Sequence, residues 1–282
     1  MGLVAYNKGS SQSCWPLCLK KKSTFFRQII TQPTHTPFLG PWFHYTDDLG
    51  EKERTKASIE SVEAMLEKIP SYSYFGQAFH PSITNWLPMY WNGFEATTNY
   101  TYVIDSLQDI DTVYGNFSRL RKRLIKKTVH LKLEEDLDPA EFYAFHKQSL
   151  EQQGKTVSYS VEHLRKIVSA SYNNKSGKTM CIRDDLGNLL SAVFFVWDER
   201  SAYYLVSATS NNPKDGSLTR LVWEAMQFLQ DKTVAFDFEG SMIRNVESVF
   251  RSFGARQQLY FSVNRYRSKV LHTGLMLKKV WL

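Results

Sequence analysis

The sequence contains few cysteines and no long apolar segment. Among 282 residues there are 3 cysteines, and this odd, small number argues against a disulfide framework and favours a reducing compartment. Cys14 and Cys18 have no histidine at ligand spacing, so we interpret them as small apolar side chains in a strand rather than as metal ligands. No apolar run approaches the roughly 20 residues that cross a bilayer, and the first residues lack the pattern of a secretory signal. We therefore expect a cytoplasmic protein without a transmembrane segment.

Several common catalytic motifs are also absent. The chain has no HExxH, GxSxG, Walker-type loop or GxGxxG sequence, so metalloprotease, hydrolase, P-loop and Rossmann interpretations have no support. Its 7 histidines are scattered, and none is paired with a serine or cysteine in a recognisable nucleophile setting. We expect no metal site.

The composition is that of a globular protein with a basic excess. Hydrophobic residues make up 43% and charged residues 22% of the chain, which is enough apolar material for a substantial core. Lysine and arginine total 35 against 28 acidic residues, for a net charge of +7. This excess favours anionic partners such as nucleotides, charged RNA or a membrane surface, but it does not require any of them.

The pattern of residues divides the chain into two units near residue 98. In the first unit, residues 1–98, short β segments precede a helix over 47–69, in which Ile59, Val62, Leu66 and Ile69 follow helical spacing. An aromatic-rich β region follows Pro70. This order predicts an α+β unit.

The second unit, residues 99–282, mixes strands and helices in an irregular order. We expect strands at 101–105, 130–136, 233–240 and 258–267, a three-strand antiparallel meander over 178–210, and helices at 109–128, 138–154, 160–172, 217–230 and 243–253. The central meander excludes a regular parallel βαβ array and again predicts the α+β class.

Two acidic residues end the predicted strand TVAFDFEG. Val234, Phe236 and Phe238 should point to one face of it, and Asp237 and Glu239 to the other with Ala235. The two carboxyl groups would then lie roughly 7 Å apart, where one raises the pKa of the other and a general base for an amine can form. The alternative is that one carboxylate only caps the next helix or pairs with an arginine.

That next helix should bury one face and expose a charged one. We expect Ile243, Val246, Phe250 and Phe253 to be buried, with Gly254 just beyond the helix end. The other face carries Arg244, Glu247 and Arg251. Glu247 and Arg251 are four residues apart in the favourable order, and a surface ion pair worth a few tenths of a kcal/mol is the alternative to a functional role.

Two further segments are suited to phosphate groups. Gly216 and Ser217 begin a predicted helix, where backbone N–H groups can hold an anion, although an ordinary helix start has the same pattern. The segment RLRKRLIKK predicts a basic helical face opposite Ile125, for which a solvated surface is the alternative. The residues of this face are Arg119, Lys122, Arg123, Lys126 and Lys127.

The second unit resembles the FemAB-like group of GNAT acyltransferases, also labelled methicillin-resistance-type or BioF2-like proteins. The resemblance lies in TTNYTYVID, NFSRLRKRLIKKT, SAVFFVWDERSAYYLVSAT, GSLTRLVWEAMQF and, above all, FDFEGSMIRNVESVFRSFGARQQLYF. It covers residues 70–282 well and 15–45 more loosely. It implies two GNAT-like units with mixed, mainly antiparallel sheets flanked by helices: an N-terminal unit, 1–98, that looks truncated, and a C-terminal acyltransferase domain, 99–282.

The resemblance also implies an activity. Such an enzyme would be a bacterial N-acyltransferase that moves an acyl or aminoacyl group from an activated donor to an amine by direct attack, in cell-envelope biosynthesis. The donor would be acyl-CoA, an acyl carrier protein or aminoacyl-tRNA, and the acceptor a small or lipid-linked amine, with tRNA and a peripheral membrane surface as further partners. The alternatives are a non-catalytic RNA- or membrane-binding protein on the same fold, and a degenerate structural subunit.

Residue roles follow from the same resemblance. The catalytic residues would be Asp237, Glu239 and Arg251; the donor-binding residues Gly216, Ser217, Arg220, Gly240 and Ser241; and the substrate-binding residues Arg119, Arg121, Arg123, Tyr204 and Glu247. The sequence departs from the group in two respects. The loop before residue 216 lacks the glycine-rich form common among acetyl-CoA users, which argues against ordinary CoA, and no helical arm for tRNA is visible.

Overall fold

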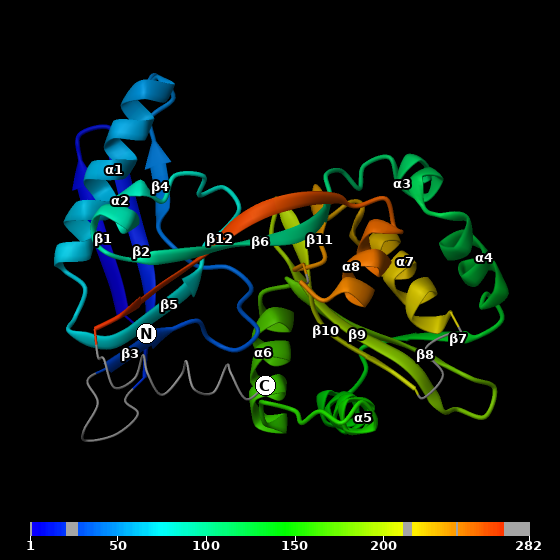
Figure 1. Cartoon of the computed structure of the whole chain (residues 1–282). Helices are drawn as coiled ribbons and strands as arrows, with labels where there is room; N and C mark the ends of the chain where they lie inside the picture. Colours follow the sequence, from blue (N-terminus) through cyan, green and yellow to red (C-terminus); the bar gives the residue numbers. More distant parts are fainter. Residues whose placement is uncertain (1, 21–27, 211–215, 241, 268–282) are drawn as a thin grey trace. The chain divides into compact units, whose positions relative to one another are not determined.

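Figure 1 shows a computed structural model of the chain, which describes residues 2–20, 28–210, 216–240 and 242–267. The chain folds as two compact units, residues 1–99 with 259–282, and residues 100–258. The chain returns to the first unit at residue 259 because β12 (Arg256–Tyr266) pairs with β5 (Tyr72–Ala78) over Ser262–Tyr266. The predicted ranges 1–98 and 99–282 left this strand in the second unit. The GNAT-like character of each single unit remains a prediction.

The first unit is a mixed sheet that packs against α1. Its strands follow the order β1-β2-β3-β5-β12, with β4 beside β2, and only the β3–β5 pair is parallel among those described. Its core centres on Trp15 and Phe75, whose rings meet edge to face, and Trp15 Nε1 donates a 2.7 Å hydrogen bond to Gln77 Oε1. The remaining elements are β1 (Gly2–Lys8), β2 (Ser11–Lys20), β3 (Gln28–Thr31), β4 (Trp42–Tyr45), α1 (Glu51–Glu67) and α2 (Leu87–Trp91).

The second unit is a mixed sheet with helices on both faces. Its strands follow the order β6-β11-β10-β9-β8-β7, and β10–β11 is the parallel pair in this part of the described chain. Its elements are β6 (Glu95–Ile104, which begins in the first unit), α3 (Ile110–Asn116), α4 (Arg119–Lys127), β7 (Lys132–Glu135), α5 (Pro139–Gln152), α6 (Val161–Asn173), β8 (Gly177–Arg183), β9 (Leu189–Trp197), β10 (Ser201–Thr209), α7 (Ser217–Leu229), β11 (Ala235–Asp237) and α8 (Arg244–Arg251).

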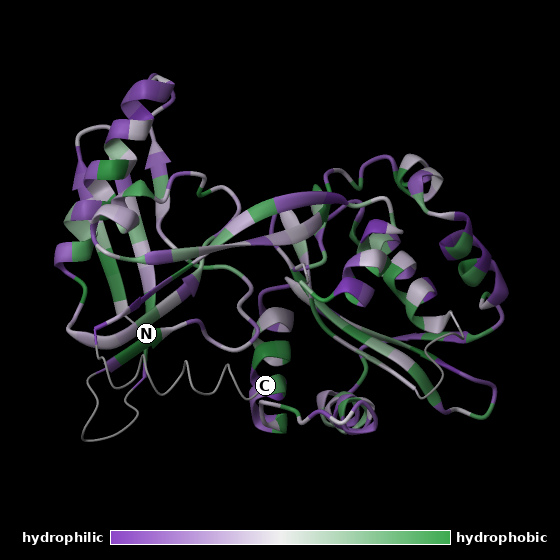
Figure 2. Ribbon diagram, in the orientation of Figure 1, coloured by the Kyte–Doolittle hydropathy of each residue, from purple (hydrophilic) through white to green (hydrophobic). Residues whose placement is uncertain are grey.

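Two separate cores define the two faces of this sheet. One core joins the sheet to α3, α4, α7 and α8 through residues such as Phe195, Phe236 and Phe250. The other joins it to α5 and α6 through residues such as Phe142 and Phe194. We call these the α7/α8 face and the α5/α6 face; Figure 1 shows the helices on either side of β8, β9 and β10, and Figure 2 shows the hydrophobic stretches of these strands.

The predicted fold class is confirmed: the chain is α+β, with mixed, mainly antiparallel sheets flanked by helices. The meander β8-β9-β10 lies where it was predicted, and its first turn is held by Asp184, which accepts hydrogen bonds from the N–H groups of Leu186 and Asn188. Helix α5 begins at Pro139, and Asp138 caps it by accepting from Ala140 and Glu141 N–H groups. These local signals are reliable because each satisfies backbone donors that would otherwise lack partners.

Three local predictions were wrong. The predicted helix 109–128 is two helices, because Phe117 has extended backbone and the Ser118 side chain caps α4 by accepting from Arg121 N. The aromatic segment after Pro70 contains the short helix α2 as well as strands. The side chain of Ile243, predicted to be buried, is 59% exposed, because α8 begins only at the next residue.

In the part of the chain that the structure describes, no helix has both the length and the apolar character needed to cross a membrane.

Candidate active site

The candidate site lies where β10 and β11 separate. The two parallel strands pair over Ser201–Tyr203 and Ala235–Asp237, and in the described residues β10 continues to Thr209 without a β11 partner. The pairing of β10 with β9 shifts register between Tyr204 and Val206, which is a β-bulge. Because one extra residue reverses the alternation of side chains, Tyr204 packs on the α7/α8 face while Val206 packs on the α5/α6 face.

Asp237 is a buried carboxyl group at this point. Its neighbours Phe236 and Phe238 belong to the core of the α7/α8 face, so Asp237 points to the α5/α6 face. The side chain is 4% exposed. Its Oδ1 accepts hydrogen bonds from Thr101 Oγ1 and from Glu239 N, the latter at 2.7 Å. Burial raises the pKa of Asp237 to about 6, and these two hydrogen bonds oppose the rise.

The carboxyl group of Glu239 interacts electrostatically with that of Asp237. Its backbone is left-handed, with φ of 61°, and this turn lets its N–H group reach the Asp237 carboxylate. Its Oε1 is buried and has no hydrogen-bond partner among the described residues. Burial and the negative charge of Asp237 raise the pKa of Glu239 well above its ordinary value. Glu239 therefore holds its proton more strongly than an ordinary glutamate does.

Gly240 is required by the close approach of β6. Its φ is +71°, and a Cβ atom would lie 2.1 Å from the carbonyl oxygen of Tyr100 and 2.7 Å from Thr101 Cα. Only glycine fits such a contact between two backbones. Gly240 thus allows the turn at Glu239 to pack closely against β6. Ser241, predicted beside it, lies outside the described residues.

Tyr203 joins the carboxyl pair and was missed by the sequence analysis. It is the β10 residue in register with Asp237, so both side chains point to the same face. Burial first, and then the negative charges of Asp198, Asp237 and Glu239, raise the pKa of Tyr203 to about 12. A neutral phenol therefore lies near the two carboxyl groups. Its position depends on the register of β10 with β11, which no local sequence pattern indicates.

Tyr204, predicted as a substrate-binding residue, lies on the other face. Its ring centroid is 6.4 Å from that of Phe236 and 6.1 Å from that of Phe238. Its phenol is buried, which raises its pKa to about 12. Its surroundings are those of a core residue.

Arg251 and Glu247 are also on the α7/α8 face. Arg251 Nε donates to Glu247 Oε1 at 2.8 Å, and the same oxygen accepts from Tyr102 Oη at 3.0 Å. Gln257 Nε2 in turn donates to that phenol oxygen at 2.8 Å. The structure therefore brings Arg251 together with Glu247, as their spacing indicated, but it does not bring Arg251 to the Asp237–Glu239 pair, because the sheet lies between them. The role of Arg251 toward an anionic donor stays a prediction.

The start of α7 is held tightly by α4. Gly216 is the residue before the helix, with φ of +93°, and a Cβ atom there would lie 3.1 Å from Leu124 Cβ. Ser217, the first helical residue, is fully buried. Arg220 donates to the carbonyl oxygens of Thr128 and Leu131 and pairs with Glu224 at 3.0 Å. Arg220 thus connects the end of α4 to α7, and its guanidinium group makes its hydrogen bonds and ion pair within the protein.

The basic residues of α4 have different surroundings. Arg121 is half-buried, and its guanidinium donates to Ser252 Oγ at 2.7 Å and to Thr219 Oγ1 at 2.6 Å. Arg119 and Arg123 are exposed, as are Lys126 and Lys127, and Figure 2 shows α4 as largely hydrophilic. Arg121 therefore connects elements, whereas its two neighbours remain available to an anionic partner.

Comparison with known proteins supports the fold. No family model matches the chain, and no curated protein matches it in sequence. In structure it is similar to FemX (TM-score 0.66, 11% identity, covering 92% of this chain and 87% of that one). It is also similar to L-PGS from Bacillus licheniformis (TM-score 0.57, 10% identity, 98% and 88% covered). A third similar structure is the C-terminal domain of a proposed lysylphosphatidylglycerol synthetase from Agrobacterium fabrum (TM-score 0.54, 11% identity, 96% and 85% covered).

These similarities extend over most of each chain, and at such low identity they concern the fold. The chain therefore shares its fold with FemX, with L-PGS and with the lysylphosphatidylglycerol synthetase domain.

Proposed function

We propose that the protein transfers an acyl or aminoacyl group from an activated donor to an amine of a cell-envelope precursor. One observation carries the proposal: two carboxyl groups with raised pKa values, Asp237 and Glu239, lie together at the point where the parallel strands separate. Paired acids whose environments separate their pKa values are a pattern of acid and base groups. The similarity of the fold to FemX and to a lysylphosphatidylglycerol synthetase domain supports this class of reaction.

In the proposed reaction Asp237 is the general base. The amine nitrogen attacks the donor's carbonyl carbon and forms the new C–N bond, and the nitrogen loses its extra proton to the Asp237 carboxylate. A pKa near 6 leaves this carboxylate ionised at neutral pH and still able to accept a proton. The hydrogen bonds from Thr101 and Glu239 N hold it in one orientation.

Glu239 is the proposed general acid. As the bond between the carbonyl carbon and the leaving group breaks, the departing oxygen or sulfur takes the electron pair and the proton of Glu239. The charge of Asp237 and burial keep this proton on Glu239 until then. Tyr203, which is neutral and beside the pair, is suited to donate a hydrogen bond to the developing oxyanion.

The identity of the donor is part of the proposal. Acyl-CoA, an acyl carrier protein and aminoacyl-tRNA all present a reactive carbonyl at the end of a long phosphate-bearing chain. The start of α7 at Gly216 can interact favourably with such a phosphate. The exposed arginines and lysines of α4 extend the positive charge next to it, which favours the larger polyanion, aminoacyl-tRNA.

Substitution of the two acids tests the site. We expect Asp237→Asn and Glu239→Gln each to lower the rate of transfer from a labelled donor by about 10²- to 10⁴-fold, the usual contribution of a general acid or base. The matched control is Glu199→Gln, which changes an exposed carboxylate of the same unit and should leave the rate within twofold. Full activity in both site variants, with unchanged circular dichroism, would refute the assignment.

The second candidate function is binding of a nucleic acid or an anionic membrane without catalysis, and the exposed basic face of α4 favours it. Binding of this kind should weaken steeply with salt, because neutralised phosphates release counterions. Charge reversal at Arg119, Arg123 and Lys126 should abolish binding to RNA or anionic vesicles. Binding that survives both treatments would exclude α4 as the contact surface.

A further inference from the structure

Helix α2 of the first unit exposes three large side chains. Leu87, Tyr90 and Trp91 are 47%, 60% and 55% exposed, and their spacing places them on one side of the helix. The other side is anchored, because Met89 is buried in the core of the first unit. A leucine and two aromatic side chains therefore project from a helix that is itself held in place.

Two arginines lie beside the end of this helix. Arg265 Cζ is 5.3 Å from the centroid of the Phe94 ring, and a Cβ atom on Gly93 would lie 3.5 Å from Arg265 Nη2. Arg267 follows directly after β12, and its Cζ is 4.6 Å from the centroid of the Tyr72 ring. Both rings belong to the core that anchors α2. The two guanidinium groups thus stack on the rim of that core.

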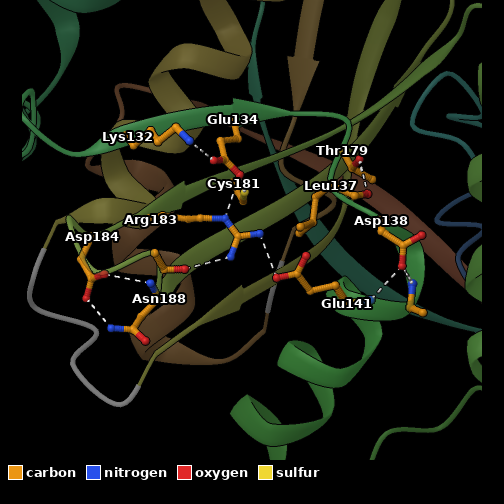
Figure 3. A network of polar contacts seen from close by, with 12 residues as sticks. Lys132, Glu134, Leu137, Asp138, Glu141, Thr179, Cys181, Arg183, Asp184 and Asn188 are labelled. Carbon is orange, nitrogen blue, oxygen red and sulfur yellow. Dashed lines mark hydrogen bonds and ion pairs between the residues drawn. The ribbon is translucent and has the colours of Figure 1, made fainter.

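Neither of these two guanidinium groups is neutralised by the protein. Among the residues that the structure describes, neither forms an ion pair, and Glu95, the carboxylate nearest to α2 in the sequence, pairs with no cation. Arg183 of the second unit shows the opposite arrangement, since it donates to Glu134 Oε2 at 2.7 Å and to Glu141 Oε1 at 2.8 Å (Figure 3). The two arginines beside α2 therefore keep their charge for an external anion.

We propose that this part of the first unit binds the surface of an anionic lipid bilayer. We call it the α2 surface; its residues are Leu87, Tyr90, Trp91, Arg265 and Arg267. Tyrosine and tryptophan rings favour the headgroup level of a bilayer, and leucine favours the boundary with the acyl chains. Guanidinium groups bind lipid phosphates with two parallel hydrogen bonds. The net charge of +7 adds attraction to an anionic leaflet.

The composition of the α2 surface favours a bilayer over a nucleic acid. Single-stranded nucleic acids bind to aromatic rings with open faces, on which the bases stack. The Tyr90 ring instead packs edge to face with that of Trp86, with 5.6 Å between the centroids. Leu87 has no group that pairs with a base or a phosphate. A bilayer accommodates the aliphatic side chain, the two aromatic rings and the two cations together.

Binding at the α2 surface does not rest on the proposed function, because every residue of this surface belongs to the first unit. It adds to that function in one respect, which does rest on it. A chain bound to a bilayer meets amine acceptors that carry a lipid, so the proposed transfer would be directed to lipid-linked acceptors.

Co-sedimentation of the full chain with lipid vesicles tests the proposal. Phosphatidylcholine vesicles that contain about a third of phosphatidylglycerol should bind the protein, and phosphatidylcholine alone should bind it at least about tenfold more weakly. Binding to the anionic vesicles should also weaken as salt is added, because salt screens the attraction between the arginines and the headgroups.

A pair of tryptophan variants tests the apolar contact. Trp91→Ser should lower the partition coefficient on anionic vesicles about tenfold, since it removes a large apolar side chain from the bilayer. Trp42→Ser is the matched control, because Trp42 is 53% exposed in the same unit. Its neighbour Phe43 packs on the core that anchors α2, so Trp42 points to the opposite face of the sheet. The control should bind like the wild type.

A pair of arginine variants tests the charge. Arg267→Gln should lower binding to anionic vesicles about fivefold, the usual contribution of one basic residue near such a surface. Arg123→Gln removes an equal charge from the exposed side of α4 and should change binding by less than about twofold. Circular dichroism of the variants confirms that each is folded.

The outcomes separate this proposal from the proposed function. No binding to anionic vesicles, equal losses in Trp91→Ser and Trp42→Ser, or a loss in Arg123→Gln alone would overturn the α2 surface as the lipid contact. Binding of RNA, or self-association of the chain, that Trp91→Ser removes would overturn the bilayer as its partner. Asp237→Asn should bind vesicles like the wild type, so loss of transfer in that variant concerns the proposed function only.

Discussion

At the scale of single residues, Asp237 is held in surroundings that disfavour its charged form. Its pKa is about 6 in the folded chain against an ordinary value of 3.8, so between these values the folded state binds more protons than the unfolded state. The group's contribution to stability is therefore fully present below about pH 4 and is lost as the pH rises through about 6. The raised pKa of Glu239 acts in the same direction.

The loss of stability on ionisation of Asp237 leads to a prediction about Asp237→Asn. The amide can still accept from Thr101 and Glu239 N, but it carries no charge, so the variant should be more stable than the wild type at pH 7.5 by up to roughly 3 kcal/mol, the equivalent of a shift of about two pH units. Urea unfolding at pH 4.5 and 7.5 measures this, and the difference should fall to roughly 1 kcal/mol at pH 4.5. A variant that is less stable than the wild type at pH 7.5 would show that the charge is not destabilising.

Gly240 supports a second prediction at this scale. Gly240→Ala should lower the free energy of unfolding by about 3 kcal/mol or more, because its Cβ would meet the backbone of Tyr100 and Thr101. Gly187→Ala is the control: its φ is also positive, at +83°, but nothing lies within 4 Å of the added atom, so only the backbone strain of about 1 kcal/mol applies. Equal losses in the two variants would mean that contact with β6 is unimportant.

The sequence indicated part of this site. Alternation in TVAFDFEG correctly separated Asp237 from Phe236 and Phe238, because a strand places successive side chains on opposite faces. It did not distinguish Tyr203 from Tyr204. The bulge after Tyr204 has no marker in the sequence. Unless the position of the bulge is known, the face of the sheet to which each β10 side chain points cannot be assigned. The sequence likewise did not indicate that Arg251 and Asp237 lie on opposite faces of the sheet.

At the scale of elements, Arg121 connects α4 to α7 and to the end of α8. Arg121→Ala should destabilise the chain by about 1–3 kcal/mol, because it removes hydrogen bonds to Thr219 and Ser252 and the contact with the Phe253 ring. Arg123→Ala, on the exposed side of the same helix, should change stability by no more than about 0.5 kcal/mol. Thermal unfolding of the two variants makes the comparison, and similar melting temperatures would contradict the connecting role.

Helix ends were predictable where a cap residue stands before an apolar pattern, as at Asp138 and Ser160. The break between α3 and α4 was not, because Ser118 lies inside a continuous helical pattern and becomes a cap only when Phe117 turns its ring into the core against Phe253. Tertiary packing thus overrode the local periodicity.

At the scale of the whole molecule, the predicted fold class and the resemblance to FemAB-like proteins both agree with the structure. The return of the chain to the first unit through β12 was not predicted, because pairing between residues as distant as Ser262 and Ala78 has no local signal. Long-range strand pairing depends on the complete chain rather than on any one segment.

Donor binding is testable at this scale. An acyl-CoA or an aminoacyl-tRNA at 100 times its dissociation constant should stabilise the folded chain by about 2.7 kcal/mol and raise its melting temperature. A shift with tRNA alone should disappear when Arg119 and Arg123 are reversed in charge, whereas a shift with acyl-CoA alone should not. The absence of a shift with both would remove these two donor classes from the proposal.

The pH dependence of kcat/KM for acyl transfer, in the wild type and in Asp237→Asn, tests the central claim most directly. If Asp237 is the base, kcat/KM of the wild type rises with a midpoint near pH 6 and then levels off. The variant should be slower by at least about 10²-fold and should lack that midpoint, although it folds at least as stably. The same midpoint and a similar rate in both proteins would show that the proton is accepted elsewhere.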